Sequence, residues 1–379
     1  MSGGTTSVIN ATLAGVIAAA QKSKKIDKIY AGAPGIVGFM GDCLIDLTRT
    51  SKAELAVLKQ SPGSASVGTT RAKILNDRDM ARLRECFDKY GIGYFVNIGG
   101  NGTIEQTKAI ASNIKSVQLA AAPKTVDNDL GDDGFRELWF TPGFPSCVNY
   151  WYHKMHMLDN ENRGASTHDR VLIAQTFGRE TGFIVGSMRL FDTERKLPLV
   201  LLLPEDQQAP EKVLSKIEDN LSKFGRSLVG ICEGYTVRSY DHSYDFSGQK
   251  MYGSSSSSAV QQLINLCTEN GIKARGFNPT VDQRQNFDHT LESDVRVSYD
   301  IGEEIVKNFM KGETHFFQAY SRDGLHIVPL EKIGNYSRTL KEEWIQRGCF
   351  DVTDEYVSYL TELAPTMRRR SLYTFGSVV

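Results

Sequence analysis

Strand-length apolar runs alternate with helix-length amphipathic stretches along this chain, and this alternation is the feature that most constrains its fold. Candidate strands lie at residues 28–31, 94–98, 117–122, 171–175, 199–203, 228–232, 272–276 and 316–319. Candidate helices lie at residues 8–22, 53–58, 77–90, 103–114, 182–191, 209–223, 259–269, 294–310 and 340–347. Strands that alternate with helices predict βαβ units, and therefore parallel sheets with helices on both faces.

The elements fall into two blocks that meet near residues 140–165, where the polar segment 159–169 is typical of a connection. A chain of 379 residues is long enough for two domains. We therefore predict an α/β fold of two Rossmann-like three-layer domains with largely parallel sheets and an active site in the cleft between them. The predicted domains are residues 1–150 and 151–340, followed by a helical segment at 341–379 that packs back on the body.

Net charge, the lengths of apolar runs and cysteine spacing argue against several classes of protein. The net charge of −1 argues against nucleic-acid or membrane-surface binding driven by bulk charge, since proteins with those roles usually carry a basic excess. No apolar run approaches the roughly 18 residues that a membrane span needs, and we expect no signal peptide. The six cysteines include no C-x-x-C pair, so we interpret them as free thiols in a reducing compartment and expect a cytoplasmic protein.

Residues 99–103, Gly-Gly-Asn-Gly-Thr, follow an apolar run and form the first candidate site. Glycines at a strand end let the backbone approach a phosphate with no Cβ in the way. We expect Thr103 to cap the helix that follows, whose N-terminus offers free N–H groups and a partial positive charge to an anion. An ordinary Asn-Gly turn between strand and helix stays open as the alternative.

Residues 123–129, Pro-Lys-Thr-Val-Asp-Asn-Asp, follow the next candidate strand and form the second candidate site. A phosphoryl-transfer enzyme acting on an alcohol needs one carboxylate to accept the hydroxyl proton and a second acid near the metal, and Asp127 and Asp129 suit these roles. Lys124 supplies a cation for the transferring group, and Thr125 can bond a phosphate oxygen or hold the acceptor. The alternative is a solvated acidic turn, but the ordered combination favours phosphoryl transfer.

Residues 2–4, Ser-Gly-Gly, precede a helical pattern at 9–20 and are typical of a glycine turn at an anion-binding helix N-terminus. Such a turn follows a strand, but only Met1 stands before it. The loss of a central strand would expose apolar surface on its neighbours and leave ladder groups unpaired. We therefore expect translation to start further upstream.

Further motifs accompany these three segments: Asn10, Phe177-Gly178-Arg179, Glu233-Gly234, Arg275 and Gln283-Arg284. Together they resemble the phosphofructokinase family, from Ser2 to about Leu363, and residues 351–353 with Tyr359-Leu360 resemble its pyrophosphate-using branch. The resemblance implies transfer of a phosphoryl group to the 1-hydroxyl of fructose 6-phosphate, giving fructose 1,6-bisphosphate in glycolysis. Residues 1–150 would bind the donor and residues 151–340 the sugar phosphate.

The resemblance also implies roles for single residues. Asp127 would be the general base, and Arg179 would bind the substrate and neutralise the transferring phosphoryl. Contacts with fructose 6-phosphate would come from Thr125, Asp127, Phe177, Gly178, Arg179, Glu233 and, at the 6-phosphate, Arg284. Arg170 and Arg275 would reach that phosphate from a neighbouring subunit, which implies a homo-oligomer, a dimer or a tetramer. The donor would face Gly4, Arg71, Gly100, Asn101, Gly102, Thr103 and Lys124, and Mg²⁺ would be held by Asn101 and Asp129.

Four positions depart from the family pattern. Asn101 stands where aspartate is usual, so magnesium binding should weaken. Phe177 replaces a methionine, Thr5 replaces a proline, and Val281 stands where a histidine or another polar residue often contacts the sugar phosphate. These departures keep open a divergent, non-catalytic relative that binds sugar phosphate.

Two positions give conflicting predictions of the phosphoryl donor. In the family that the chain resembles, a glycine at the position of Gly102 leaves room for the α-phosphate of ATP, where an aspartate would clash. Lys124 is typical of the pyrophosphate enzymes of that family but also occurs in some ATP-using members. Because the open pocket is a steric requirement, we expect ATP. The alternative is a reversible pyrophosphate–fructose 6-phosphate 1-phosphotransferase. A kinase for NAD or lipid that shares only the glycine loop would leave the arginines at 170, 179, 275 and 284 unexplained.

Overall fold

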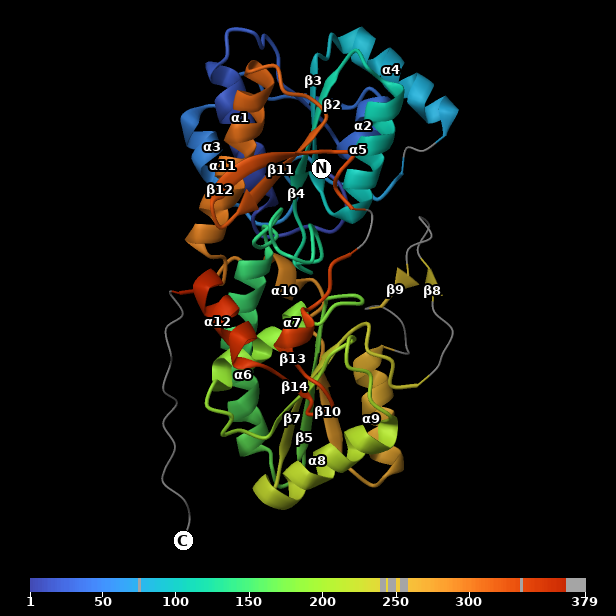
Figure 1. The fold of residues 1–379 in the computed structure, drawn as a ribbon, viewed down its shortest axis with the longest axis vertical. Helices are drawn as coiled ribbons and strands as arrows, with labels where there is room; N and C mark the ends of the chain where they lie inside the picture. Colours follow the sequence, from blue (N-terminus) through green and yellow to red (C-terminus); the bar gives the residue numbers. More distant parts are fainter. Residues whose placement is uncertain (74–75, 239–242, 245–249, 253–257, 335–336, 366–379) are drawn as a thin grey trace. The chain divides into compact units, whose positions relative to one another are not determined.

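A computed structural model of the chain describes residues 1–73, 76–238, 243–244, 250–252, 258–334 and 337–365 (Figure 1). The chain forms two compact units, each discontinuous in sequence. The first comprises residues 1–147, 242–251 and 281–339, and the second comprises 148–241, 252–280 and 340–379. The domain boundaries at residues 150 and 340 stay a prediction, and residues 366–379 of the expected C-terminal segment lie outside the described part.

The main sheet of the first unit has the strand order β12-β11-β4-β3. β3 (Tyr94–Gly99), β4 (Gln118–Pro123) and β11 (Phe316–Ser321) are parallel, and β12 (Gly324–Pro329) returns antiparallel to β11. β3 and β4 end level with each other, because Gly99 lies beside Pro123. The two candidate loops therefore leave the sheet at the same end.

Helices cover both faces of this sheet (Figure 1), with α1 (Ile9–Lys22) and α11 (Glu292–Met310) on one side and α4 (Asp77–Tyr90) and α5 (Asn101–Asn113) on the other. Side chains of α4 and α5 pack on β4 and β11 in an apolar core that includes Leu83, Phe87, Ile104, Leu119 and Phe317. The unit is completed by α2 (Gly35–Met40), α3 (Lys52–Gln60), α10 (Asp282–Gln285) and the antiparallel pairs β1 (Tyr30–Gly32) with β2 (Leu44–Asp46) and β8 (Ser243–Tyr244) with β9 (Lys250–Met251).

Two glycines let α1 and α11 pack backbone against backbone. A Cβ on Gly15 would lie 2.1 Å from the carbonyl oxygen of Tyr299, and a Cβ on Gly302 would lie 2.1 Å from that of Thr12. Any larger residue at either position would force the helices apart. This contact fixes α1, whose N-terminus follows the glycine turn, against α11.

The second unit contains a fully parallel sheet of order β10-β5-β7-β6. Its strands are β5 (Val171–Thr176), β6 (Leu199–Leu202), β7 (Ser227–Cys232) and β10 (Ala274–Phe277). In the core of this unit, Val171, Ile173 and Val229 of the strands pack with Val213 of α8 (Pro210–Phe224) and Leu263 of α9 (Ala259–Glu269). α7 (Phe183–Ser187), η1 (Met188–Asp192), η2 (Glu342–Trp344), β13 (Ile345–Gln346), β14 (Asp351–Val352) and α12 (Asp354–Leu363) complete the unit.

A continuous helix, α6 (Phe144–Gly164), runs through the predicted meeting point of the two blocks. The expectation of a connection at residues 159–169 is therefore wrong for its first half. The signal lies upstream of this polar stretch, where Cys147, Trp151, Met155 and Leu158 are buried at helical spacing. No helix among the described residues is long and apolar enough to span a membrane.

Other differences concern short elements. The helix expected at residues 340–347 is wrong, because only the single turn η2 forms before Ile345 and Gln346 pair with β14. Gly348, with a φ of +69°, turns the chain between these two strands. The strand expected at residues 28–31 starts at Tyr30 and pairs with β2, outside the parallel sheet. By contrast, α4 keeps its predicted bounds, since Asn76 caps its start and Gly91 ends it in a left-handed conformation.

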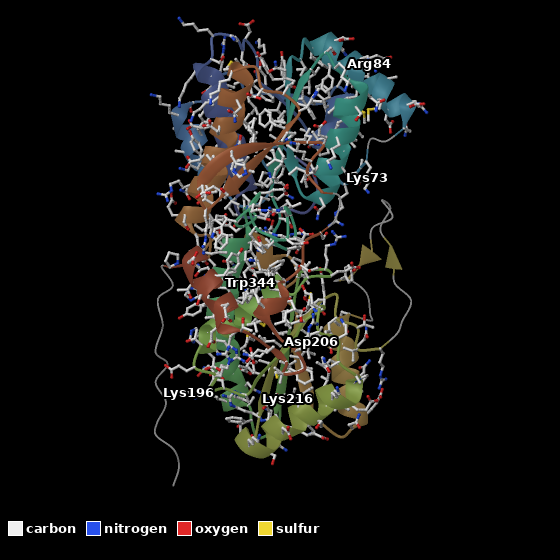
Figure 2. The ribbon with its side chains drawn as sticks, viewed as in Figure 1. Lys73, Arg84, Lys196, Asp206, Lys216 and Trp344 are labelled. Atoms are coloured by element: carbon white, nitrogen blue, oxygen red, sulfur yellow. The ribbon has the colours of Figure 1, made fainter. Side chains whose placement is uncertain are left out.

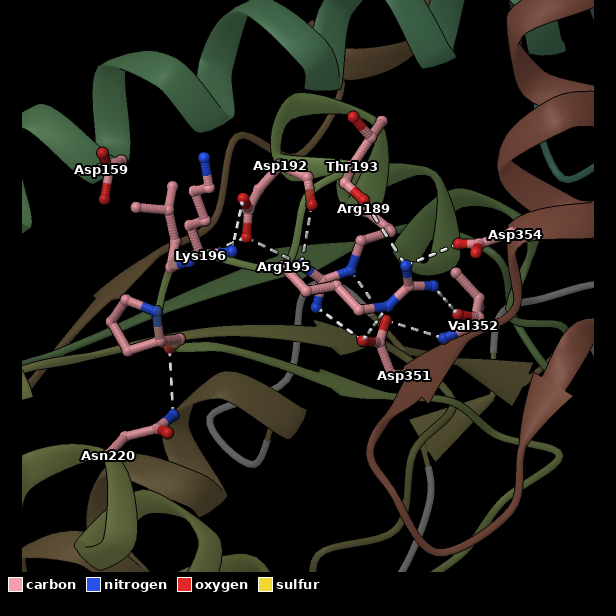
Figure 3. A network of polar contacts seen from close by, with 12 residues as sticks. Asp159, Arg189, Asp192, Thr193, Arg195, Lys196, Asn220, Asp351, Val352 and Asp354 are labelled. Carbon is pink, nitrogen blue, oxygen red and sulfur yellow. Dashed lines mark hydrogen bonds and ion pairs between the residues drawn. The ribbon is translucent and has the colours of Figure 1, made fainter. Parts of the chain in front are cut away.

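A buried ion network joins η1 to the C-terminal strand β14 in the second unit (Figure 3). The Arg189 guanidinium, 2% exposed, donates to both carboxylate oxygens of Asp351 at 2.8 Å and to Asp192 at 2.9 Å. Arg195 also pairs with Asp351, at 3.3 Å, and with the exposed Asp354, at 2.6 Å. The network ties together parts of the chain that are far apart in sequence.

We expect Asp351→Ala to lower the free energy of unfolding by about 3 kcal/mol, because removal of one partner leaves a buried guanidinium without its bidentate acceptor. The matched control is Asp354→Ala, which removes an 81% exposed carboxylate from the same network and should cost less than about 1 kcal/mol. Urea unfolding followed by tryptophan fluorescence measures both. Equal losses in the two variants would contradict the importance of the buried pair.

Candidate functional site

The glycine loop after β3 is shaped by close contacts. A Cβ on Gly99 would lie 2.0 Å from Thr103 Oγ1 and 2.9 Å from the carbonyl oxygen of Ser2. Gly100 occupies the N-cap of α5, and its carbonyl oxygen accepts from the N–H groups of Thr103 (2.9 Å) and Ile104 (3.2 Å). The expectation that Thr103 caps the helix is therefore wrong, because the helix begins two residues earlier. The start of α5 still offers backbone N–H groups to an anion.

The acidic loop after β4 lies directly beside the glycine loop. The N–H of Lys124 donates to the carbonyl oxygen of Gly99 at 3.0 Å, and the Asn101 side-chain amide donates to Asp129 Oδ2 at 2.9 Å. Asp129 is buried, whereas Asp127 and Thr125 are half-buried. The Asp127 N–H donates to Thr125 Oγ1 at 3.2 Å, so these two residues are held as neighbours. The structure thus brings the two sequence motifs together.

Lys124 is buried beneath the glycine turn at residues 2–4. Its ammonium group donates to the carbonyl oxygens of Ser2, at 3.1 Å, and Gly4. Burial and the nearby guanidinium groups of Arg284 and Arg71 lower the pKa of Lys124 to about 7, against the opposing effect of Asp127 and Asp129. A cation that shares its surroundings with two other cations suits a phosphate-rich ligand.

Arg284 reaches the same glycine turn from α10. A Cβ on Gly4 would lie 2.9 Å from Arg284 Nη1, so the glycine makes room for this guanidinium. The Thr5 hydroxyl donates to Gln285 Oε1 at 2.8 Å and holds α10 beside the turn. Asn10 anchors another loop, since its amide donates to the carbonyl oxygen of Ser61 and its Oδ1 accepts from the Ser66 hydroxyl.

Lys73, labelled in Figure 2, lies next to the glycine loop. Its Cε is 3.9 Å from the position that a Cβ of Gly102 would take, and its Nζ pairs with Glu105 at 3.3 Å. Both the lysine and the glutamate side chain are about half exposed. The space that Gly102 leaves is therefore bordered by a long, charged side chain.

The side chains at these two loops could hold magnesium only together with phosphate oxygens. Among the described residues there is no group of three or more histidine, cysteine, aspartate or glutamate side chains placed to hold a metal. Mg²⁺, however, is commonly held by one or two carboxylates, waters and substrate phosphates. Asp129, next to Asn101, fits that pattern.

In the second unit, two loops meet after β5 and β7, whose ends are level because Thr176 lies beside Cys232. The Arg179 N–H donates to Glu233 Oε1 at 3.2 Å. Arg179 adopts a φ of +55°, and a Cβ on Gly234 would lie 1.5 Å from its carbonyl oxygen. Only glycine fits at residue 234. The segment that carries Glu233 can therefore pack closely against the Arg179 backbone only because glycine follows Glu233.

Cys232 contacts the same loop through its side chain. Its buried thiol lies 3.7 Å from the carbonyl oxygen of Phe177, 3.5 Å from that of Arg179 and 3.4 Å from that of Thr181. A Cβ on Gly178 would come within 2.5 Å of the Thr181 carbonyl oxygen. Phe177, Gly178 and Arg179 are thus held in one tight turn.

Arg170 and Arg275 lie at the other end of β5 from Arg179. Arg170 donates to the carbonyl oxygens of Leu221 and Gly225 at the C-terminal end of α8. Arg275, 56% exposed on β10, pairs with Asp169 at 2.5 Å. Within one chain the structure does not bring these arginines to the Arg179 loop, so their expected role toward a neighbouring subunit stays a prediction.

Sequence reasoning missed Ser337 and Arg338, which contact the acidic loop within the first unit. The Ser337 hydroxyl donates to Asp129 Oδ2 at 3.2 Å and accepts from the Asn101 amide at 3.0 Å. Arg338 donates to Asn128. No local pattern could identify them, because their partners lie about two hundred residues earlier in the chain.

The comparison with protein families decides the identity of the fold. The phosphofructokinase family model matches residues 1–289. The chain belongs to the phosphofructokinase family. The expectation of a phosphotransferase family and of an α/β phosphofructokinase fold is confirmed.

Three relatives illustrate the range of this family. A pyrophosphate–fructose 6-phosphate 1-phosphotransferase of Methylococcus capsulatus is 28% identical over 96% of this chain and 90% of its own. The crystal structure of a pyrophosphate-dependent phosphofructokinase from Nitrosospira multiformis, 27% identical, matches 99% of this chain and 93% of its own with a TM-score of 0.83. An ATP-dependent 6-phosphofructokinase of Bacteroides thetaiotaomicron is 25% identical over 90% of this chain and 94% of its own.

We expect binding of inorganic pyrophosphate to protonate Lys124. At pH 8 a lysine with a pKa of about 7 is mostly neutral, and an adjacent anion raises that pKa, so the wild type should take up about one proton per chain. The uptake should disappear below about pH 6, where Lys124 is already charged. Calorimetric titration in buffers of different ionisation enthalpy measures it.

The control for this titration is Lys124→Arg, whose guanidinium stays protonated throughout. The difference between the two proteins isolates Lys124 from protons that pyrophosphate itself exchanges. Equal proton uptake by the wild type and Lys124→Arg at pH 8 would contradict the lowered pKa.

We expect Asn101→Asp to strengthen magnesium binding in the presence of pyrophosphate, roughly tenfold, because it adds a second carboxylate beside Asp129 and ligand charge sets the affinity of such sites. Asn101→Ala removes the amide without adding charge and serves as the control. Calorimetric titration with MgCl₂ measures the affinity. An unchanged affinity in Asn101→Asp would place the metal away from residue 101.

Proposed function

We propose that this chain is a pyrophosphate–fructose 6-phosphate 1-phosphotransferase. It would transfer a phosphoryl group from pyrophosphate to the 1-hydroxyl of fructose 6-phosphate, giving fructose 1,6-bisphosphate and phosphate, and would run in both directions. The observation that carries the proposal is the buried Lys124 among Arg284, Arg71 and the glycine turn, a cationic site suited to a compact polyphosphate. The pyrophosphate-dependent relatives support the same donor.

The sequence-based preference for ATP is not supported by these relatives. Gly102 remains the one feature that favours ATP, since a Cβ there would meet only the Lys73 stem, at 3.9 Å. An ATP-dependent 6-phosphofructokinase is therefore the second candidate, in line with the Bacteroides relative. A non-catalytic relative that binds sugar phosphate is the third.

In the proposed reaction the protein aligns the reactants and neutralises charge. The half-buried Asp127 carboxylate takes the proton from the 1-hydroxyl as its oxygen bonds to the transferred phosphorus, and the bond from that phosphorus to the leaving phosphate breaks. Thr125 orients the acceptor, Arg179 and Lys124 balance the charge on the moving group, and Arg284 holds the 6-phosphate. Asp129 and Asn101 would hold Mg²⁺, whose charge would help neutralise the donor.

The remaining assignments follow the family resemblance. Phe177, Gly178 and Glu233 would shape the sugar pocket, and Gly4, Arg71, Gly100 and Thr103 would surround the donor. Arg170 and Arg275 would complete the site of a neighbouring subunit, so the protein would act as a homo-oligomer.

The test of the proposed function is formation of fructose 1,6-bisphosphate from fructose 6-phosphate and Mg²⁺, with pyrophosphate and ATP in parallel. We expect turnover with pyrophosphate and, from fructose 1,6-bisphosphate and phosphate, the reverse reaction. Turnover with ATP alone would move the assignment to the second candidate. Asp127→Asn should lose most turnover yet still bind fructose 6-phosphate, whereas wild-type protein that binds the sugar phosphate without turnover would support the non-catalytic relative.

We expect Arg179→Ala to lower kcat roughly 10²- to 10³-fold, by analogy with loss of one electrostatic donor to the transition state. Arg82→Ala, which removes a surface arginine from α4, controls for a general effect of charge loss. Steady-state kinetics with the preferred donor measures both. A loss below about tenfold would argue against Arg179 at the transferring group.

A further inference from the structure

Arg338 donates hydrogen bonds to the acidic loop from the interior of the first unit. It is completely buried, yet its guanidinium contacts backbone and amide oxygens of two distant segments. Nε donates to the Asn128 carbonyl oxygen at 2.7 Å, Nη2 to Asn128 Oδ1 at 2.7 Å, and Nη1 to the Leu138 carbonyl oxygen at 2.5 Å. Its backbone N–H donates to the Asp129 carbonyl oxygen at 3.0 Å, and the guanidinium carbon lies 3.9 Å from the Phe135 ring centroid.

Asn128, which accepts two hydrogen bonds from Arg338, lies in sequence between Asp127 and Asp129. Asn128 has a φ of +58°, a left-handed conformation that strains most residues and that asparagine tolerates better than others. Its Oδ1 also accepts from the Thr141 N–H at 2.9 Å. Because the conformation of Asn128 sets the relative directions in which the chain continues to Asp127 and Asp129, holding this residue restrains the backbone that carries both carboxylates.

The residue before Arg338 joins the same arrangement. Ser337 bonds both Asp129 and the Asn101 amide, so residues 337 and 338 connect the acidic loop with the start of α5. A planar guanidinium can hold the main-chain and side-chain oxygens of Asn128 at once, whereas a lysine ammonium lacks this fork.

The geometry points to Arg338 as a positioning residue for phosphoryl transfer, acting through Asn128 on the general base Asp127. This inference rests on the proposed function for its kinetic consequence. We expect loss of the Arg338 contacts to lower kcat more than it weakens substrate binding, because small displacements of a reacting group reduce the rate steeply.

The test compares Arg338→Lys with the wild type and with Arg189→Lys, a variant of a similarly buried arginine in the second unit. We expect Arg338→Lys to lower kcat roughly 10- to 100-fold with little change in KM for fructose 6-phosphate. Arg189→Lys should lower stability and leave kcat unchanged at temperatures where the protein is folded. Equal loss of kcat in both variants would overturn the inference.

Hydrogen exchange measured by mass spectrometry supplies a readout that needs no activity. Arg338→Lys should speed exchange in peptides that cover residues 125–141, whereas Arg189→Lys should leave those peptides at the wild-type rate. If the wild type turns over neither donor, the proposed function fails, and the exchange experiment still decides whether Arg338 holds the loop. Wild-type exchange in Arg338→Lys would overturn the inference.

Discussion

The two pairs of candidate loops, those after β3 and β4 and those after β5 and β7, lie together because the parallel strands that carry them end level with each other. Gly99 beside Pro123 in the first unit, and Thr176 beside Cys232 in the second, bring together loops that are separated in sequence by a helix or more. Because parallel strands end at the same side of a sheet, a shift of register would separate the motifs. Strand pairing therefore determines which loops lie beside each other.

Buried charge is the second recurring theme. In the first unit, Lys124 and Arg338 lie in the interior, and backbone or amide oxygens satisfy their donors. In the second unit, Arg189 is satisfied by two carboxylates. In the first unit the carboxylates of Asp127 and Asp129 act on Lys124, and that of Glu137 acts on Arg338, through their charge, whereas in the second unit carboxylates accept directly from the Arg189 guanidinium. Buried cations thus lie at the candidate site in the first unit and connect distant segments of the chain in the second.

Local patterns predicted the elements and motifs whose signals are local. α4 and α9 keep their predicted bounds, and the glycine and acidic loops follow the strands that were expected to carry them. The contacts of Arg338 and Ser337 could not be predicted, because nothing near residue 338 indicates a partner at residue 128. The predicted start of α5 at residue 103 was two residues too late, because Gly100 takes the N-cap and the helix begins at Asn101. α6 was missed because polar residues near its end obscured its buried positions.

The order of segments within the first unit has a consequence for synthesis on the ribosome. β4 ends at Pro123, but its neighbour β11 starts only at Phe316, after the whole four-stranded sheet of the second unit has been made. A nascent chain therefore holds an incomplete first sheet while the intervening segments emerge, and its exposed strand edge is open to wrong pairing. Expression of residues 1–150 alone would reproduce that unfinished intermediate.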